Sequence, residues 1–129
     1  MTEMVASPVQ ILLAEDEEHI AKLVAFKLGR EGFAVTHAKN GQEAIAQLRS
    51  RPWVLIILDV MMPLADGWQV LRAARAEPAT ARVPVLMLTA KSYQQDLANA
   101  SGLGATEFLK KPFDPAHLAE TVRKLVSAP

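Results

Sequence analysis

Carboxylates stand at the ends of two apolar segments of this chain. The first segment, residues 10–14, is followed by Glu15 and Asp16, and the second, residues 54–58, is followed by Asp59. If the two segments form neighbouring parallel strands, three like charges share one small pocket. Such a cluster resists full ionisation unless a cation joins it, and its oxygen ligands suit a hard ion such as Mg²⁺. The pattern therefore indicates a metal site, although a single strand-end aspartate would be read as a helix cap or a turn residue.

The composition limits the classes of protein to be considered. The 129 residues suit one domain, the absence of cysteine excludes disulfides and thiolate metal sites, and no apolar run reaches the length of a membrane span. Fourteen basic and 14 acidic residues leave no basic footprint for nucleic acid. Residues 1–7 resemble no signal peptide, so we expect a short disordered leader, a domain at 8–127, a tail at 128–129 and a cytoplasmic location.

Apolar segments alternate with amphipathic segments five times. We expect strands at residues 10–14, 33–38, 53–59, 84–89 and 105–110. Helices are expected to begin after Asp16, near Gly41, near Asp66-Gly67, near Tyr93 and at Pro115, which follows the N-cap residue Asp114. Hydrophobic residues at helical spacing predict the buried stripes: Ile20, Leu23, Val24 and Leu28; Ala44, Ile45 and Leu48; Val70, Leu71 and Ala74; and Leu118, Val122, Leu125 and Val126.

A (βα)₅ pattern predicts an α/β fold in which a doubly wound parallel sheet has helices on both faces. The first, third and fourth strands are continuously apolar, as central strands should be, whereas the second and fifth carry polar residues and are expected at the edges. Right-handed crossovers then favour the flavodoxin-like order 2-1-3-4-5. In that order the carboxyl ends of the first and third strands form the switch point where such folds bind ligands, and Glu15, Asp16 and Asp59 lie there.

Two more polar residues belong to the same edge of the predicted sheet. Thr89 closes the fourth strand, and Lys111 follows the fifth. Two of the three carboxylates, Glu15 and Asp16, could hold a cation, and Asp59 would be the central carboxylate. Thr89 adds a hydroxyl donor and Lys111 adds an ammonium group. A phosphoryl group would satisfy all of them, with Asp59 as the nucleophile that forms an acyl phosphate. The histidines His19, His37 and His117 are scattered through different elements and form no expected ligand set.

At this point the residues resemble a known family, the receiver domain of response regulators in two-component signalling, of the chemotaxis-regulator type. The resemblance covers residues 8–127 and rests on five motifs in a specific order and spacing. They are ILLAEDE at 11–17, LDVMMP at 58–63, Asp66-Gly67, LTA at 88–90 and FLKKPF at 108–113. Two positions depart from the common pattern, because many members have Asp in place of Glu15 and Gly in place of Leu64.

The resemblance implies roles for the acidic residues. Asp59 would be the phospho-acceptor. Asp16 and Asp59 would bind Mg²⁺ together with the backbone carbonyl of Met61, and Glu15 would hold a metal-bound water. Glu15 stands where many members have Asp, and this difference should preserve metal binding.

The resemblance also implies which residues contact the phosphoryl group. Thr89 and Lys111 would do so, and Lys111 rather than Lys110 is chosen because the family's lysine directly precedes the proline. The bond between Lys111 and Pro112 is expected to be cis. Phe108 would be a switch residue that turns inward when Thr89 moves, although sequence alone favours a plain core aromatic there.

The resemblance implies a regulator rather than an enzyme. A histidine kinase or phosphotransfer protein would donate the phosphoryl group, small acyl phosphates could substitute, and self-dephosphorylation is expected. The surface of the fourth helix, fifth strand and fifth helix would then control a downstream partner or output domain. We expect no direct contact of this segment with nucleic acid or membrane, and a phosphorylation-dependent dimer stays open.

Other readings of the residues also stay open. A phosphohydrolase of the haloacid dehalogenase type uses a strand-end aspartate and Mg²⁺, but that class resembles Asp-x-Asp, and Met61 stands two residues beyond Asp59. A flavodoxin-like cofactor module would need a phosphate-cradling loop where Glu15 and Asp16 would repel phosphate. A degenerate receiver is disfavoured by the intact acidic set. Ala116 and Thr121 stand where a DNA-binding branch of the family often has basic residues, which favours a stand-alone regulator or another branch.

Overall fold

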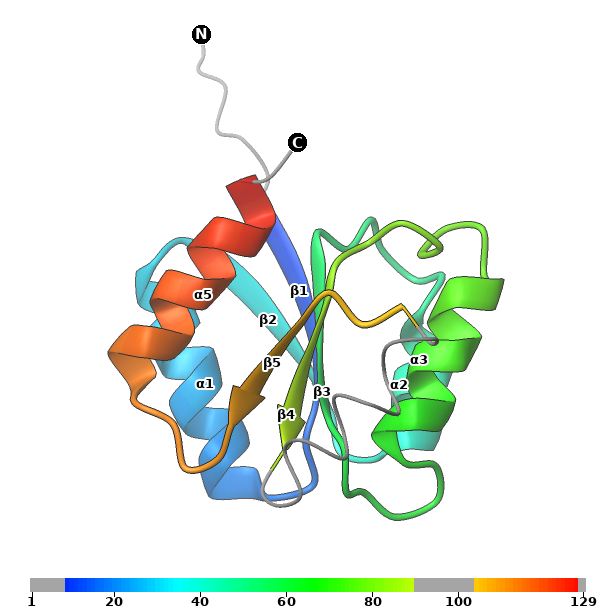
Figure 1. Cartoon of the computed structure of the whole chain (residues 1–129), viewed down its shortest axis with the longest axis horizontal. Helices are drawn as coiled ribbons and strands as arrows, with labels where there is room; N and C mark the ends of the chain where they lie inside the picture. Colours follow the sequence, from blue (N-terminus) through cyan, green and yellow to red (C-terminus); the bar gives the residue numbers. More distant parts are fainter. Residues whose placement is uncertain (1–8, 90–103, 128–129) are drawn as a thin grey trace, which may run out of the picture.

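The predicted alternation of strands and helices is present in the computed structural model, which describes residues 9–89 and 104–127 (Figure 1). The elements are β1 (Val9–Ala14), α1 (Glu18–Arg30), β2 (Phe33–Ala38), α2 (Gly41–Gln47), β3 (Leu55–Asp59), α3 (Gly67–Ala76), β4 (Val85–Thr89), β5 (Glu107–Lys110) and α5 (Pro115–Ser127). The third, fourth and fifth strands begin one or two residues later than expected. The leader, the tail and the helix expected at 93–101 lie outside the described residues.

The five strands form one parallel sheet in the order β2-β1-β3-β4-β5, which confirms the predicted topology. The three central strands are the apolar ones, and the residues of β3 and β4 are all buried. Because every pair of neighbours is parallel, all five carboxyl ends meet at one edge of the sheet, toward which β4 and β5 point in Figure 1. This edge is where the polar residues of the predicted site emerge.

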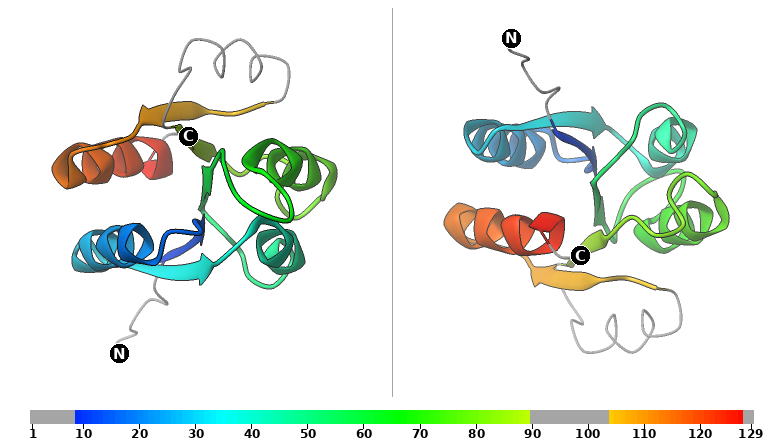
Figure 2. Two further views of the ribbon diagram at one scale, coloured as in Figure 1. Left: turned by 90° about the horizontal axis from the view of Figure 1, so that it is seen from below. Right: turned by 90° about the horizontal axis from the view of Figure 1, so that it is seen from above.

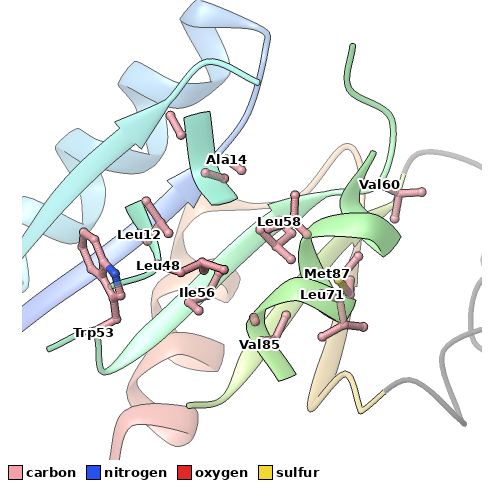
Figure 3. Close-up of a cluster of buried hydrophobic side chains, with 14 residues drawn as sticks. Leu12, Ala14, Leu48, Trp53, Ile56, Leu58, Val60, Leu71, Val85 and Met87 are labelled. Atoms are coloured by element: carbon pink, nitrogen blue, oxygen red, sulfur yellow. The ribbon is translucent and has the colours of Figure 1, made fainter. Parts of the chain in front are cut away.

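Helices cover both faces of the sheet (Figure 2). Helices α1 and α5 lie on one face, over a core that includes Leu13, Ile57 and Leu86. Helices α2 and α3 lie on the other face, over a core that includes Ile56 and Leu58 (Figure 3). Within the described residues, no helix is long and apolar enough to cross a membrane.

Two residues assigned to the core by their spacing are in fact exposed. Leu23 is 44% exposed and Ile45 is 37% exposed, whereas Val24 and Ala44 beside them are fully buried. Successive helical residues point about 100° apart, so α1 and α2 can turn only a narrow stripe toward the sheet. Leu125 and Val126 of the predicted α5 stripe are half-buried and pack against the core, while Leu118 and Val122 are fully buried.

The start of α3 is fixed close to the end of β3. The side chain of Asp66 accepts a hydrogen bond from the Gln69 backbone, and the Gln69 side chain accepts one from the Asp66 backbone, which forms a capping box. Gly67 donates its backbone N–H to the Val60 carbonyl at 2.9 Å. A Cβ atom on Gly67 would lie 2.5 Å from the Asp59 carbonyl oxygen. The close approach of α3 to the acidic residue therefore requires glycine.

We predict opposite effects of alanine at two helical glycines. Gly67→Ala should lower the free energy of unfolding by about 1–3 kcal/mol, because its methyl group overlaps rigid backbone. Gly29→Ala is the matched control, since a Cβ there meets no atom within 4 Å, and it should raise the free energy of unfolding by up to about 1 kcal/mol. Urea unfolding measures both values. Equal behaviour of the two variants would contradict the close approach.

Candidate functional site

The strand register places the predicted carboxylates side by side. Ala14 of β1 pairs with Leu58 of β3, so Glu15, one residue beyond β1, and Asp59, the last residue of β3, lie at the same edge of the sheet. Glu15 is fully buried and Asp59 is 4% exposed, whereas Asp16 is exposed. One carboxylate oxygen from each of the three residues lies within 4.8 Å of the other two. The structure therefore brings together the three acidic residues that the sequence singled out.

Lys111 directly follows the edge strand β5, and its side chain reaches this cluster. Its Nζ atom lies 2.9 Å from Glu15 Oε1 and 3.2 Å from Asp59 Oδ2, and its side chain is only 10% exposed. Lys110, the alternative lysine, is exposed. The Lys111 backbone N–H donates to the Thr89 carbonyl at 2.7 Å, which extends the pairing of β4 with β5 beyond the strand. The peptide bond between Lys111 and Pro112 is cis, as expected.

The electrostatics of the site favour a proton or a cation at Asp59. Burial, followed by repulsion from Glu15, raises the pKa of Asp59 to about 7, and the attraction of Lys111 offsets only part of this rise. Burial alone would lower the pKa of Lys111, but its contacts with Glu15 and Asp59 outweigh burial and raise that pKa above its ordinary value. Lys111 is thus held as a cation, and Asp59 is a carboxylate whose negative charge is incompletely compensated.

The donor set fits a divalent cation. Glu15 Oε1 is buried, and although Lys111 Nζ is close enough for an ion pair, no donor among the described residues meets hydrogen-bond geometry at this oxygen. This buried acceptor and the carboxylates of Asp16 and Asp59 beside it match the hard oxygen ligands that Mg²⁺ prefers. Met61 lies beside the cluster, since its backbone N–H donates to Asp59 Oδ1 at 3.2 Å. Its carbonyl is the metal ligand that the resemblance implies.

The two predicted switch residues differ in their exposure. Thr89 is 1% exposed at the end of β4, and Phe108 on β5 is half-buried against the core on the α2 and α3 face. The ring of Phe108 lies 6.3 Å from the ring of Trp68 on α3, at an interplanar angle of 50°. The geometry therefore connects Phe108 to a natural fluorophore near the start of α3.

Leu64, where the resemblance leads one to expect glycine, has an unusual backbone conformation. Its φ angle is 72°, in the left-handed region that glycine enters easily and a Leu side chain does not. Such a residue stores on the order of 1 kcal/mol of strain. The side chain is 72% exposed, so no burial offsets that strain.

A groove beside the cluster accounts for the exposed Leu23. It has a volume of about 370 Å³. Its lining residues are Glu17, Ile20, Leu23, Lys111, Pro112 and Phe113. An apolar surface thus leads directly to the lysine of the site. The helical spacing of apolar residues along α1 is the same for a residue that lines this groove and for one in the core, so it could not predict that Leu23 is exposed.

Sequence reasoning missed two residues of the acidic site. Glu17 Oε1 lies 3.9 Å from Lys111 Nζ, and its backbone N–H donates to Glu15 Oε2 at 3.1 Å. His37, set aside as one of three scattered histidines, places Nε2 2.6 Å from the Glu15 carbonyl oxygen. Its position one residue before the end of β2 was the only available signal, because contacts between strands do not follow from spacing along the chain.

Residues 11–123 match the family described as the response regulator receiver domain. The chain is 38% identical over 117 residues to the transcriptional regulatory protein ResD of Bacillus subtilis (strain 168), covering 91% of this chain and 48% of that protein. It is 35% identical over 118 residues to the phosphate regulon regulatory protein PhoB of Escherichia coli (strain K12), covering 91% and 51%. The chain thus spans about half the length of these curated relatives.

Solved structures give the same result. The chemotaxis protein CheY4 of Vibrio cholerae superposes with a TM-score of 0.87 at 30% identity, covering 92% of this chain and 99% of that one. The receiver domain of the sensor histidine kinase PA1611 from Pseudomonas aeruginosa PAO1 does so with a TM-score of 0.86 at 29% identity, covering 95% and 100%, and it holds a magnesium ion in its active site cleft. The motifs, the sheet order and these matches lead to one conclusion: this chain belongs to the response regulator receiver domain family of phosphorelay signalling.

Proposed function

We propose that this chain is a phosphorylation-controlled switch that accepts a phosphoryl group on Asp59. The observation that carries the proposal is one buried carboxylate placed between two acidic neighbours and a buried lysine. Membership of the receiver family supports phosphorylation-based signalling in general terms. The acceptor, the metal and the controlled surface are our specific assignments.

The chemistry at Asp59 follows from its surroundings. A carboxylate oxygen would attack phosphorus, forming the P–O bond of an acyl phosphate while the bond from phosphorus to the donor breaks. With a phosphohistidine donor, the electron pair of the broken P–N bond stays on the imidazole. Lys111 already lies 3.2 Å from the attacking carboxylate, so its ammonium can pair with a phosphoryl oxygen. Small acyl phosphates can serve as donors, and hydrolysis of the product would reset the switch.

Bound Mg²⁺ would supply positive charge to the incoming phosphoryl oxygens. We assign Asp16, Asp59 and the Met61 carbonyl as its ligands, with Glu15 holding a metal-bound water. The proximity of the three carboxylates and the buried acceptor on Glu15 support this assignment. A protonated Asp59 is a poor ligand, so the raised pKa of Asp59 makes metal binding compete with a proton.

We assign the conformational response to Thr89 and Phe108. The Thr89 hydroxyl would donate to a phosphoryl oxygen, and the half-buried Phe108 ring would turn into the space that Thr89 leaves. Full burial of a completely exposed side chain of this kind contributes about 1.5–3 kcal/mol, and the half-buried Phe108 ring would gain part of that free energy. That free energy is comparable to a gap of a few kcal/mol between two conformations.

We assign the partners by chemistry. The phosphoryl donor would be a histidine kinase or a phosphotransfer protein, and the groove lined by Ile20, Leu23 and Phe113 supports the approach of such a protein beside Lys111. A downstream partner or output domain would respond at the surface formed by residues 93–101, β5 and α5. The first of these segments lies outside the described residues. Dimerisation on phosphorylation is an open alternative for the output.

The first prediction of this proposal concerns the acceptor. Incubation with Mg²⁺ and acetyl phosphate should add one phosphoryl group to the wild-type protein, as measured by intact-mass spectrometry. Asp59→Asn should abolish the addition, because an amide oxygen is not a competent nucleophile. Asp66→Asn is the matched control, since it makes the same change at an N-cap where asparagine is also suitable. Undiminished labelling of Asp59→Asn would reject the acceptor.

The second prediction concerns pH. The folded protein holds a proton at Asp59 up to about pH 7, whereas the unfolded chain releases it near the ordinary value of 3.8. Stability should therefore fall as pH rises through this window. Asp59→Asn lacks this titration, so its stability relative to wild type should increase by up to about 1 kcal/mol per pH unit and level off above pH 7.

Urea unfolding in EDTA at pH 4 to 8 measures this difference. Repeating the series in Mg²⁺ should reduce the advantage of Asp59→Asn near pH 7, because the cation compensates the charge on Asp59. A stability difference that does not change with pH would mean that Asp59 does not exchange its proton in this range.

The third prediction uses Trp68 as a reporter of Phe108. Trp53 is the other tryptophan, so a Trp53→Phe background leaves Trp68 as the sole emitter. Beryllofluoride with Mg²⁺ should change the Trp68 emission, because the Phe108 ring that packs near it moves. Adding Thr89→Ala should retain beryllofluoride binding and suppress more than half of the change. A response of full size in the Thr89→Ala variant would show that Thr89 does not couple the phosphoryl group to Phe108.

A further inference from the structure

We propose that His37 is a positioning residue for the metal site, acting through the backbone of the acidic loop. Its Nε2 atom lies 2.6 Å from the carbonyl oxygen of Glu15. A carbonyl oxygen only accepts hydrogen bonds, so Nε2 must carry the proton and donate it. The inference rests on the proposed binding of Mg²⁺ and adds to it a residue that is neither a metal ligand nor a contact of the phosphoryl group.

The sheet register delivers His37 to this carbonyl. His37 pairs with Leu13 in the parallel ladder of β1 and β2, so both side chains point to the face covered by α1 and α5. Glu15 lies two residues beyond Leu13, where the chain leaves the sheet to enter α1. The Glu15 backbone N–H donates to the Ala38 carbonyl at 3.1 Å. Strand β2 therefore holds both backbone polar groups of Glu15, one through its main chain and one through the His37 side chain.

The held carbonyl matters because it belongs to the peptide unit that joins Glu15 to Asp16. The Glu15 carboxylate has its own contacts, to Lys111 at Oε1 and to the Glu17 backbone at Oε2. The Asp16 carboxylate is exposed, and no hydrogen bond from the described residues holds it. Its direction therefore depends on the orientation of the backbone that precedes it. Fixing the plane of the Glu15–Asp16 peptide keeps Asp16 within 4.8 Å of the other two carboxylates.

Two substitutions separate the hydrogen bond from the bulk of the ring. His37→Leu keeps an apolar side chain but removes the donor. His37→Gln places an amide N–H donor at nearly the same reach. Partners that orient metal ligands typically change metal affinity by about 10–100-fold when lost. We expect His37→Leu to raise the dissociation constant for Mg²⁺ by about tenfold, and His37→Gln to restore most of that loss.

Isothermal titration of the whole chain with Mg²⁺ alone is the test. Val35→Ala is the matched control, because Val35 lies two residues earlier on the same face of β2, packs against the core and pairs with Ile11, four residues before Glu15. It should reduce stability and leave the dissociation constant unchanged. The role of His37 is supported if His37→Leu binds Mg²⁺ weakly, His37→Gln binds it almost normally and Val35→Ala binds it normally.

Other outcomes would overturn it. The His37 donor is excluded as the cause if His37→Leu binds Mg²⁺ as tightly as the wild type does. It is also excluded if His37→Gln or Val35→Ala loses as much Mg²⁺ affinity as His37→Leu. Nitrogen-15 NMR of the wild type decides the point even if a variant does not fold, because an unprotonated Nε2 on His37 is incompatible with the bond. A wild-type protein that does not bind Mg²⁺ would instead refute the proposed metal site itself.

Discussion

Buried carboxylates repel one another at the carboxyl edge of the sheet, and the surrounding elements must offset this repulsion. Glu15 and Asp59 are almost completely removed from water, where two negative charges cannot both be stable without compensation. Lys111 supplies one positive charge and lies within 3.2 Å of an oxygen of each. One cation against two buried anions and a nearby third leaves a net negative pocket, and burial, followed by repulsion from Glu15, raises the pKa of Asp59. The pocket is thereby prepared for a proton, a metal ion, or a metal ion with an anionic group.

The fold holds this unfavourable arrangement by surrounding it with rigid elements. The acidic residues stand at the carboxyl ends of β1 and β3, two central strands that are paired with a neighbouring strand on both sides. Close contact between Gly67 and the end of β3 fixes the loop after Asp59 at its far end. Lys111 is aligned by the backbone bond to Thr89. Backbone pairing thus fixes the main chain at Glu15, Asp59 and Lys111, so that mainly the side-chain torsions of these residues remain to be ordered.

The edges of the site differ in character from its centre. Leu64 and Met61, in the loop after Asp59, are exposed apolar residues, and Leu23 lines an apolar groove next to Lys111. A strained and exposed Leu64 has no role in packing the domain. Apolar surface around a charged pocket is what a protein donor of a phosphoryl group would require, since it can bury area there while its reactive atom reaches the carboxylate. The match covers 48% and 51% of the two curated relatives, so about half of each of those proteins lies outside the region of similarity.

The strands, their order and the residues at their carboxyl ends could all be predicted from the pattern of residues along the chain. Continuous apolar runs identify β1, β3 and β4, because strands buried on both faces admit few polar side chains, and Thr36 or Glu107 marks an edge strand for the same reason. Once the order was known, Glu15, Asp16 and Asp59 had to share one edge. Which side of α1 faces the sheet depends on how the helix packs in the folded protein. This packing buries Val24 and leaves Leu23 exposed. The tertiary structure also determines that His37 reaches the carbonyl of Glu15 and that Glu17 approaches Lys111. These contacts join residues on different elements, and their distances depend on packing angles that no local pattern of residues encodes.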